Sequence, residues 1–281
     1  MPGFDDDIAL TPSECAPNAW DGAITPGWHT PRGPLGGYVM AILMRGLELA
    51  VDDSARSARS VTAHFLRPPD DGPVTVTANV ERTGRSLTTV SGRLEQDGKV
   101  IALGLAAYSK PWEGPLLNTA PMPEVEPPNP DHRPPPDAEM NPEAIGVTRS
   151  KPPAFVERLS MQQRFGEQPF SGADRGEAGG WLGLRERRPL DAPAIAMLAD
   201  AWYPAPWPML TELAPAPTID LTVHLRAPLP LPDSLLLGRF TSTLVRDGFF
   251  EEDGQLWAPD GSLVAQSRQL GLLIGAKAPG Q

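Results

Sequence analysis

The segment Ser60-Val-Thr-Ala-His-Phe-Leu-Arg-Pro68 recurs 160 positions later as Asp220-Leu-Thr-Val-His-Leu-Arg-Ala-Pro228. Thr, His and Pro occupy matching positions in the two copies. A second match, 163 positions apart, places Asp97-Gly98 over Asp260-Gly261. Matches that keep one order along a chain indicate a duplicated structural unit. The sequence therefore predicts two copies of one fold.

The first copy is predicted to be a buried helix followed by an antiparallel sheet. Residues 35–51 are almost entirely apolar apart from Arg45 and Glu48, and Gly36-Gly37 stands at their head. A helix that is apolar on nearly all sides is one wrapped by other structure. Alternating or β-branched runs predict the strands, which are 18–24, 60–67, 74–81, 86–96 and 100–108.

The second copy repeats this order of elements. Strands are predicted at 154–165 and 179–186, and a helix at 191–203. Three more strands follow at 217–227, 234–246 and 255–274, the last interrupted by the turn Pro259-Asp260-Gly261.

The predicted helix 191–203 carries one charge after its start. Asp191 can cap this helix, and Pro193 fits the first turn, where a missing N–H costs nothing. Beyond Asp191 the charged residue is Asp200, in a run of small and apolar residues. Asp200 is either solvated on a narrow exposed stripe or partly buried, and a buried carboxylate needs partners.

Residues 111–153 break both patterns, since 13 of these 43 residues are proline. This composition favours an extended linker; a peptide-binding role for the prolines is the alternative. The predicted organisation is a first repeat over 1–110, a proline-rich linker over 111–153 and a second repeat over 154–281 that carries the chemistry.

Composition excludes several classes of function. With 24 Lys and Arg against 35 Asp and Glu, the net charge of −11 argues against general nucleic-acid binding. The single cysteine, Cys15, allows no intrachain disulfide. The sequence has no membrane-spanning run, no signal peptide, no metal-ligand spacing and no phosphate-binding glycine motif. We therefore expect a cytoplasmic protein without a metal or cofactor.

A long apolar helix wrapped by an antiparallel sheet, in two copies, is the hotdog architecture. Short motifs along both halves resemble type II acyl-CoA thioesterases. In the first half they are Gly36-Gly37, His64-Phe-Leu-Arg-Pro68 and Arg82-Thr-Gly-Arg-Ser86. In the second half they are Ala199-Asp200, Pro217-Thr-Ile-Asp220 and Val264-Ala-Gln-Ser-Arg-Gln-Leu-Gly271. The resemblance implies an α+β fold, a tandem (double) hotdog with two antiparallel sheets that each wrap a long apolar helix.

The resemblance also implies an activity, the hydrolysis of an acyl-CoA thioester to free acid and coenzyme A. In that family an Asp, a Thr and a Gln hold the attacking water, and the matching positions here are Asp200, Thr218 and Gln269. A carboxylate can serve as the general base, while a hydroxyl and an amide fix the orientation of the water. Taken singly, Thr218 could be an ordinary strand residue and Gln269 a solvent-facing one.

Substrate contacts are expected mainly from the first half. The protein is also expected to act in fatty acid metabolism and to form a homo-oligomer. Gly36, Gly37 and Tyr38 are expected to form pocket wall. His29 is either loop scaffold or pocket wall. Arg85 is a candidate for the phosphates of coenzyme A, against the default of a surface arginine.

Two other classes of function stay open, a hotdog dehydratase or hydratase and a non-catalytic acyl-ligand binder. Dehydratases place a His at the active helix, and neither apolar helix here contains one. The repeat also predicts one working site per chain, because Ala58 and Ala106 stand where Thr218 and Gln269 stand in the second half.

Overall fold

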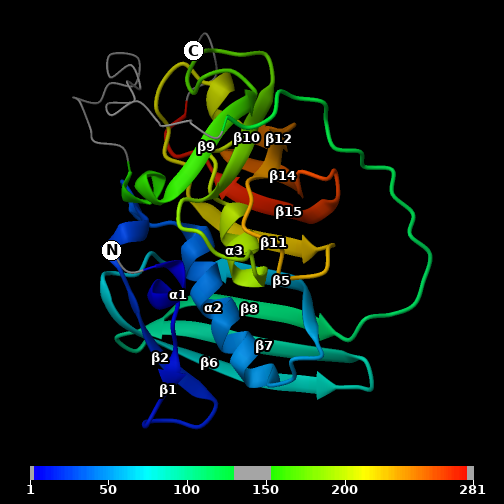
Figure 1. Ribbon diagram of the computed structural model, residues 1–281. Coiled ribbons are helices and arrows are strands. Elements are labelled where there is room, and N and C mark those ends of the chain that lie inside the picture. The colour runs from blue at the N-terminus through cyan, green and yellow to red at the C-terminus, as the bar shows by residue number, and fades with distance from the viewer. Residues whose placement is uncertain (1–2, 130–152, 277–281) are drawn as a thin grey trace.

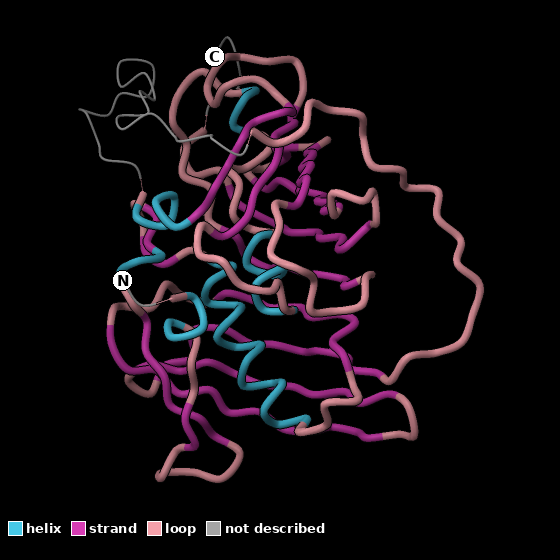
Figure 2. The backbone as a smooth tube through the Cα atoms, in the orientation of Figure 1, coloured by secondary structure: helices cyan, strands magenta, loops and turns pink. Residues whose placement is uncertain are grey.

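The computed structural model describes residues 3–129 and 153–276, whose strands form one long antiparallel sheet of thirteen strands (Figures 1 and 2). Its first half is ordered β1 (Thr11–Pro12), β2 (Ala19–Ile24), β6 (Gly72–Thr83), β7 (Leu87–Gln96), β8 (Lys99–Ser109) and β5 (Ser57–Phe65). Its second half continues with β11 (Thr218–Leu225), β15 (Leu263–Leu272), β14 (Phe249–Trp257), β12 (Leu236–Ser242), β10 (Gly176–Leu184) and β9 (Leu159–Phe165). The short strand β13 (Val245–Arg246) pairs with β14, and β3 (His29–Thr30) pairs with β4 (Gly33–Pro34).

Helices α2 (Gly36–Val51) and α3 (Ala192–Leu198) lie against one face of the sheet (Figure 1). The remaining helical segments are α1 (Phe4–Asp7) and three 3-10 turns at Pro26–Trp28, Ala154–Arg158 and Trp207–Met209. None of the helices within the described residues is long and apolar enough to cross a membrane.

The two halves of the sheet meet at β5 and β11, the strands that contain the two copies of the recurring segment. Thr62 lies opposite Thr222, with their hydroxyl oxygens 2.9 Å apart. The strand order is β2-β6-β7-β8-β5 in the first half and β11-β15-β14-β12-β10 in the second. Counted outward from the junction, corresponding strands of the two halves therefore occupy the same places in the sheet. Residues separated by 160 positions in β5 and β11 are therefore structurally equivalent.

Two details of the expected architecture are wrong. The chain forms one continuous sheet instead of two, because the edge strands β5 and β11 pair with each other. The second helix is short, 7 residues against 16 in α2. It stops at Leu198 instead of continuing to residue 203. Prolines at 204, 206 and 208 remove backbone donors just beyond that point, and the residue before a proline is disfavoured in a helix.

Three strand boundaries also differ from the expectation. Asp247 and Gly248 both adopt positive φ angles, of 54° and 82°, and form a hairpin turn. This turn lies in the segment between the predicted strands 234–246 and 255–274. Strand β14 therefore begins at Phe249, and the predicted strand 234–246 is divided into β12 and β13. At the start of the second half, residues 154–158 form a 3-10 turn before β9.

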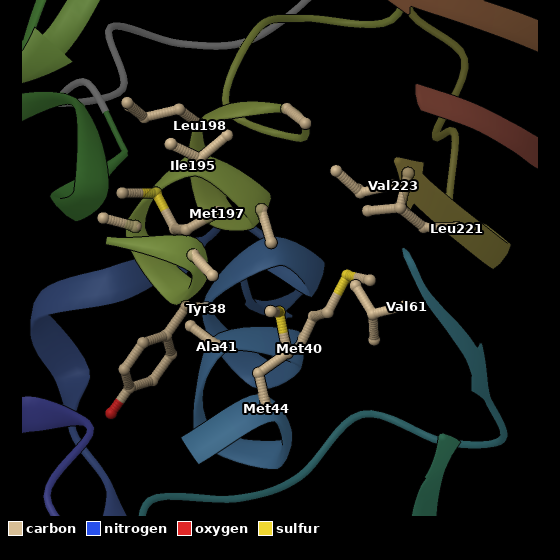
Figure 3. Packing of buried hydrophobic residues seen from close by; sticks show 14 of the residues in the cluster. Tyr38, Met40, Ala41, Met44, Val61, Ile195, Met197, Leu198, Leu221 and Val223 are labelled. Carbon is tan, nitrogen blue, oxygen red and sulfur yellow. The ribbon is translucent and has the colours of Figure 1, made fainter. Parts of the chain in front are cut away.

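One hydrophobic core joins the two halves. Met40 and Met44 of α2 lie near Ile195 of α3 and the strand residues Val61 and Val223 (Figure 3). All five side chains are fully buried or nearly so. Because α2 and α3 share this core, their ends are held in fixed positions relative to each other.

Residues 110–129 contain no helix or strand and run outside the sheet (Figure 2). Two tryptophans of the second half anchor their later part. The indole of Trp257 donates to the carbonyl of Ala120 over 3.1 Å, and that of Trp181 donates to the carbonyl of Glu126 over 2.8 Å. The rest of the predicted linker, residues 130–152, lies outside the described residues.

Candidate active site

Asp200 lies two residues beyond the end of α3 and faces the first turn of α2. Its Oδ2 accepts a hydrogen bond from the backbone N–H of Gly37 over 2.6 Å. The first N–H groups of a helix have no partner within the helix and carry partial positive charge, so they favour a carboxylate. Asp200 is partly exposed as a residue, but its carboxyl is buried. This burial raises the pKa of Asp200 to about 7, although the hydrogen bond from Gly37 acts in the opposite direction.

Glycine is required where the two helices meet. A Cβ on Gly37 would lie 2.7 Å from the carbonyl oxygen of Met197 and 2.9 Å from Cβ of Asp200. A Cβ on Gly36 would lie 3.0 Å from Oδ2 of Asp200. The Gly36-Gly37 pair therefore allows the start of α2 to approach the end of α3, as close backbone contact demands.

Thr218 and Gln269 lie on the neighbouring strands β11 and β15 and are bonded to each other. Oγ1 of Thr218 donates to Oε1 of Gln269 over 2.8 Å. The Gln269 side chain is buried, with 7% of the residue exposed. Its amide nitrogen Nε2 donates onward to Oε1 of Glu252 over 2.7 Å.

Glu252 is a buried acid that the sequence analysis missed. It lies opposite Gln269 on β14, and only 5% of the residue is exposed. Its Oε2 accepts from the backbone N–H of Ala205 over 2.6 Å. Burial first, and then the negative charge of Asp200, raise the pKa of Glu252 to about 7. The charge of Asp200 thus acts on Glu252, but within the described residues no hydrogen bond joins Asp200 to Thr218 or Gln269.

A sequence signal for Glu252 existed. In β14 the inward-facing residues alternate as Phe250, Glu252, Gly254 and Leu256. Because the sequence analysis left 249–254 outside any strand, the period-two pattern that places Glu252 on the buried face was not recognised.

Tyr38, His29 and Arg85 make their contacts with residues other than Asp200. Tyr38 points away from the strand residues Leu221 and Val223 in Figure 3. Its hydroxyl donates to the carbonyl of Asp7 over 3.0 Å, and its ring stacks on Trp28 with centroids 5.5 Å apart. The Tyr38 side chain thus ties α2 to the N-terminal segment.

His29 lies in the short strand β3, and Arg85 lies in a loop. Nε2 of His29 is 2.8 Å from Oδ1 of Asp71. Arg85 is exposed in the turn between β6 and β7, where its carbonyl accepts from Arg56, which follows the end of α2. Arg85 is therefore held near the segment that follows the end of α2, whereas Asp200 contacts the start of α2.

The corresponding place in the first half is apolar. The strand ladders align Thr218 with Ala58, Gln269 with Ala106 and Glu252 with Val90. All three first-half residues are buried.

At the start of α3, no group equivalent to Asp200 approaches from α2. Asp191 caps α3 by accepting from the N–H of Ala194 over 3.1 Å, and Nη2 of Arg45 donates to the same carboxylate over 3.0 Å. At the start of α3 the neighbouring charged group from the first half is thus the Arg45 cation, whereas at the start of α2 the neighbouring group from the second half is the Asp200 carboxylate.

A hollow on the surface lies elsewhere. It has a volume of about 470 Å³ and is lined by side chains such as Thr222, His224 and Arg268, on the sheet face opposite the helices. Asp200 and Gln269 do not line it. Within the described residues no group of His, Cys, Asp and Glu could hold a metal ion.

Comparisons with known proteins agree with this architecture. Residues 24–109 match the family model of the acyl-CoA thioesterase N-terminal domain, and residues 126–273 match that of the acyl-CoA thioesterase C-terminal domain. A search of curated proteins returned no significant match.

Solved structures share the whole fold. A hot dog fold protein of unknown function from Alicyclobacillus acidocaldarius is 24% identical, with a TM-score of 0.80 over 99% of each chain. A protein provisionally assigned as a thioesterase II from Thermobifida fusca is 28% identical, with a TM-score of 0.76 over 97% of this chain and 98% of that one. An acyl-CoA thioesterase II from Mycobacterium marinum is 19% identical, with a TM-score of 0.71 over 99% of this chain and 98% of that one.

The two family models thus cover one half of the duplicated sheet each, in the order expected from the repeat. The C-terminal model alone spans more than half of the sequence. This chain belongs to the acyl-CoA thioesterase family and is a thioester hydrolase.

Proposed function

We propose that the protein hydrolyses an acyl-CoA thioester with a water molecule activated by Asp200 and oriented by Thr218 and Gln269. The observation that carries this proposal is the position of the Asp200 carboxylate, which accepts a hydrogen bond from the first turn of α2 and has its pKa raised to about 7. A base with a pKa near the working pH is most effective in proton transfer. No described residue bonds to Oδ1 of Asp200, so this oxygen can accept a proton from water.

The chemistry balances without a metal or cofactor. Asp200 takes one proton from the water while the water oxygen bonds to the thioester carbonyl carbon. The tetrahedral intermediate then expels the thiolate by breaking the C–S bond, which releases the free acid. The proton held by Asp200 passes to the thiolate and gives coenzyme A. This route regenerates the carboxylate for the next turnover.

Hydrolysis is expected to become faster as the pH rises through about 7. The base must be deprotonated, and burial raises the pKa of Asp200 to about 7. The measurement is kcat/KM between pH 5 and 9, with thiol release as the assay. A profile that is flat between pH 6 and 8 would contradict a base of this pKa.

A panel of acyl-CoA substrates from short to long chains tests the function itself. Release of free thiol from at least one of them is expected, and addition of water across an enoyl-CoA without thiol release would instead indicate a hydratase. The hydratase reading lacks a histidine at the site. His64 and His224 are exposed strand residues, and His29 is bound to Asp71.

We further propose one working site per chain, in a double hotdog whose second half carries the chemistry. A non-hydrolysable acyl-CoA analogue is expected to bind at one equivalent per chain in calorimetry. Ala58→Ser and Ala106→Ser should leave turnover within about twofold, since the matching positions of the first half, Ala58, Ala106 and Val90, carry no acidic or amide group. Two equal binding events per chain would refute the single site.

Assembly, compartment and pocket contacts are also proposals. We propose that the protein is cytoplasmic and forms a homo-oligomer. Exposed strand residues such as Leu103 and Leu105 offer apolar surface for association, and sedimentation can test the assembly. We propose that Gly36 and Gly37, which lie against Asp200, contribute pocket wall from the first half.

A further inference from the structure

Glu252 is buried as a carboxylate that meets two hydrogen-bond donors and no cation within residues 3–129 and 153–276. One oxygen accepts from the N–H of Ala205 over 2.6 Å, and the other accepts from Nε2 of Gln269 over 2.7 Å. Burying a carboxylate is costly, so this arrangement needs a reason beyond packing. In the first half, the equivalent position is filled by the apolar Val90, which shows that the fold itself needs no acid there.

The hydrogen bonds around Glu252 have a fixed direction. An ionised carboxylate accepts at both oxygens, whereas an amide has one acceptor and one donor end. Glu252 therefore requires the NH₂ end of Gln269 to face it. The carbonyl end of Gln269 then faces Thr218, whose hydroxyl proton is used in the 2.8 Å bond to Oε1.

We propose that Glu252 is a positioning residue that sets the orientation of the Gln269 amide and, through it, of the Thr218 hydroxyl. With its proton committed to Gln269, Thr218 keeps its oxygen lone pairs free to accept a hydrogen bond from the attacking water. The inference rests on the proposed function, in which Thr218 and Gln269 orient that water. Glu252 itself does not touch the reacting atoms.

The Glu252→Gln variant reverses this direction with almost no change in shape. Its side-chain amide offers one acceptor, which the N–H of Ala205 requires. The new NH₂ group then faces Gln269, which must turn its own carbonyl toward position 252. Thr218 now meets the NH₂ group of Gln269 and has to accept instead of donate, so its hydroxyl presents the wrong end to water.

We expect Glu252→Gln to lower kcat by about tenfold or more, with KM changed less than about threefold, because one charge-assisted hydrogen bond is lost but the pocket keeps its shape. Glu251→Gln is the matched control. Glu251 is the preceding residue of the same strand, on the opposite face, and its carboxylate accepts from Thr243. This control should keep the kcat of the parent.

A second measurement uses the unmodified protein and does not depend on how the variants fold. With ¹⁵N-labelled glutamine, the Gln269 side-chain NH₂ signal, identified by its loss in Gln269→Leu, is expected to shift with pH as Glu252 titrates. A Gln269 NH₂ signal that matches a solvent-exposed glutamine throughout pH 5 to 9 would overturn the proposal, as would a Glu252→Gln enzyme with the kcat of the parent.

The failure of this inference can be told apart from the failure of the proposed function. If Asp200→Asn loses turnover while Glu252→Gln keeps it, only the role of Glu252 is wrong. If Asp200→Asn keeps its turnover, the proposed function fails as well.

Discussion

Asp200→Asn is expected to hydrolyse acyl-CoA at least about a hundredfold more slowly than the parent, the usual scale for loss of a general base. The substitution keeps the shape of the side chain and an oxygen that can accept from the N–H of Gly37. Binding of a substrate analogue should therefore change little while kcat collapses. Asp253→Asn is the control, since Asp253 is an exposed acid of β14 paired with Arg268. Equal turnover in Asp200→Asn and the parent would show that Asp200 has no part in the chemistry.

The same variant should also change how stability depends on pH. The pKa of Asp200 is about 7 in the folded protein, above the ordinary value of 3.8. The folded state therefore holds a proton that the unfolded state releases between these values. This contribution to stability is complete below pH 3.8 and is lost as the pH rises through about 7. We expect Asp200→Asn to melt a few degrees above the parent at pH 8 and to gain less at pH 5.

Gly37→Ala is expected to abolish most activity and to destabilise the protein by about 1–3 kcal/mol, the usual cost of overpacking. The new methyl group would lie 2.7 Å from the carbonyl oxygen of Met197, so the start of α2 has to move away from α3. That movement breaks the 2.6 Å bond to Asp200. In an exposed helix the same change would stabilise by up to about 1 kcal/mol, so the sign of the effect is diagnostic.

Gly36→Ala provides a graded comparison. Its Cβ would approach side-chain atoms only, Oδ2 of Asp200 at 3.0 Å and the Phe65 ring at 3.5 Å. Side chains can yield where backbone cannot, so the melting temperature of Gly36→Ala should fall less than that of Gly37→Ala. A Gly37→Ala protein that retains full turnover and melting temperature would contradict the close approach of the two helices.

The duplicated fold was predictable because the same residues recur at matching positions of corresponding strands. Thr62 and Thr222 match in sequence and also face each other across the junction of the halves. The early end of α3 and the single sheet were not predicted. The prolines that follow residue 203 were a readable signal for the early end of α3. The single sheet depends on backbone hydrogen bonds between β5 and β11, which residue periodicity does not report.

The site was predictable in part. Thr218 and Gln269 were named from the family resemblance, and they are bonded to each other across 51 positions. Glu252 was missed because its strand was not recognised. The contact between Asp200 and Gly37, 163 positions apart, arises from the packing of two helices, and no local pattern encodes it.

A crystal structure of Asp200→Asn with a bound acyl-CoA tests the central claim most directly. The account predicts that the thioester carbonyl lies within one water molecule of the side chain at position 200, with that water also within reach of Thr218 or Gln269. Each hydrogen bond spans about 3 Å, so a single water can bridge groups up to about 6 Å apart. A thioester bound beyond about 7 Å from this side chain, or in the half that contains Ala58 and Ala106, would contradict it.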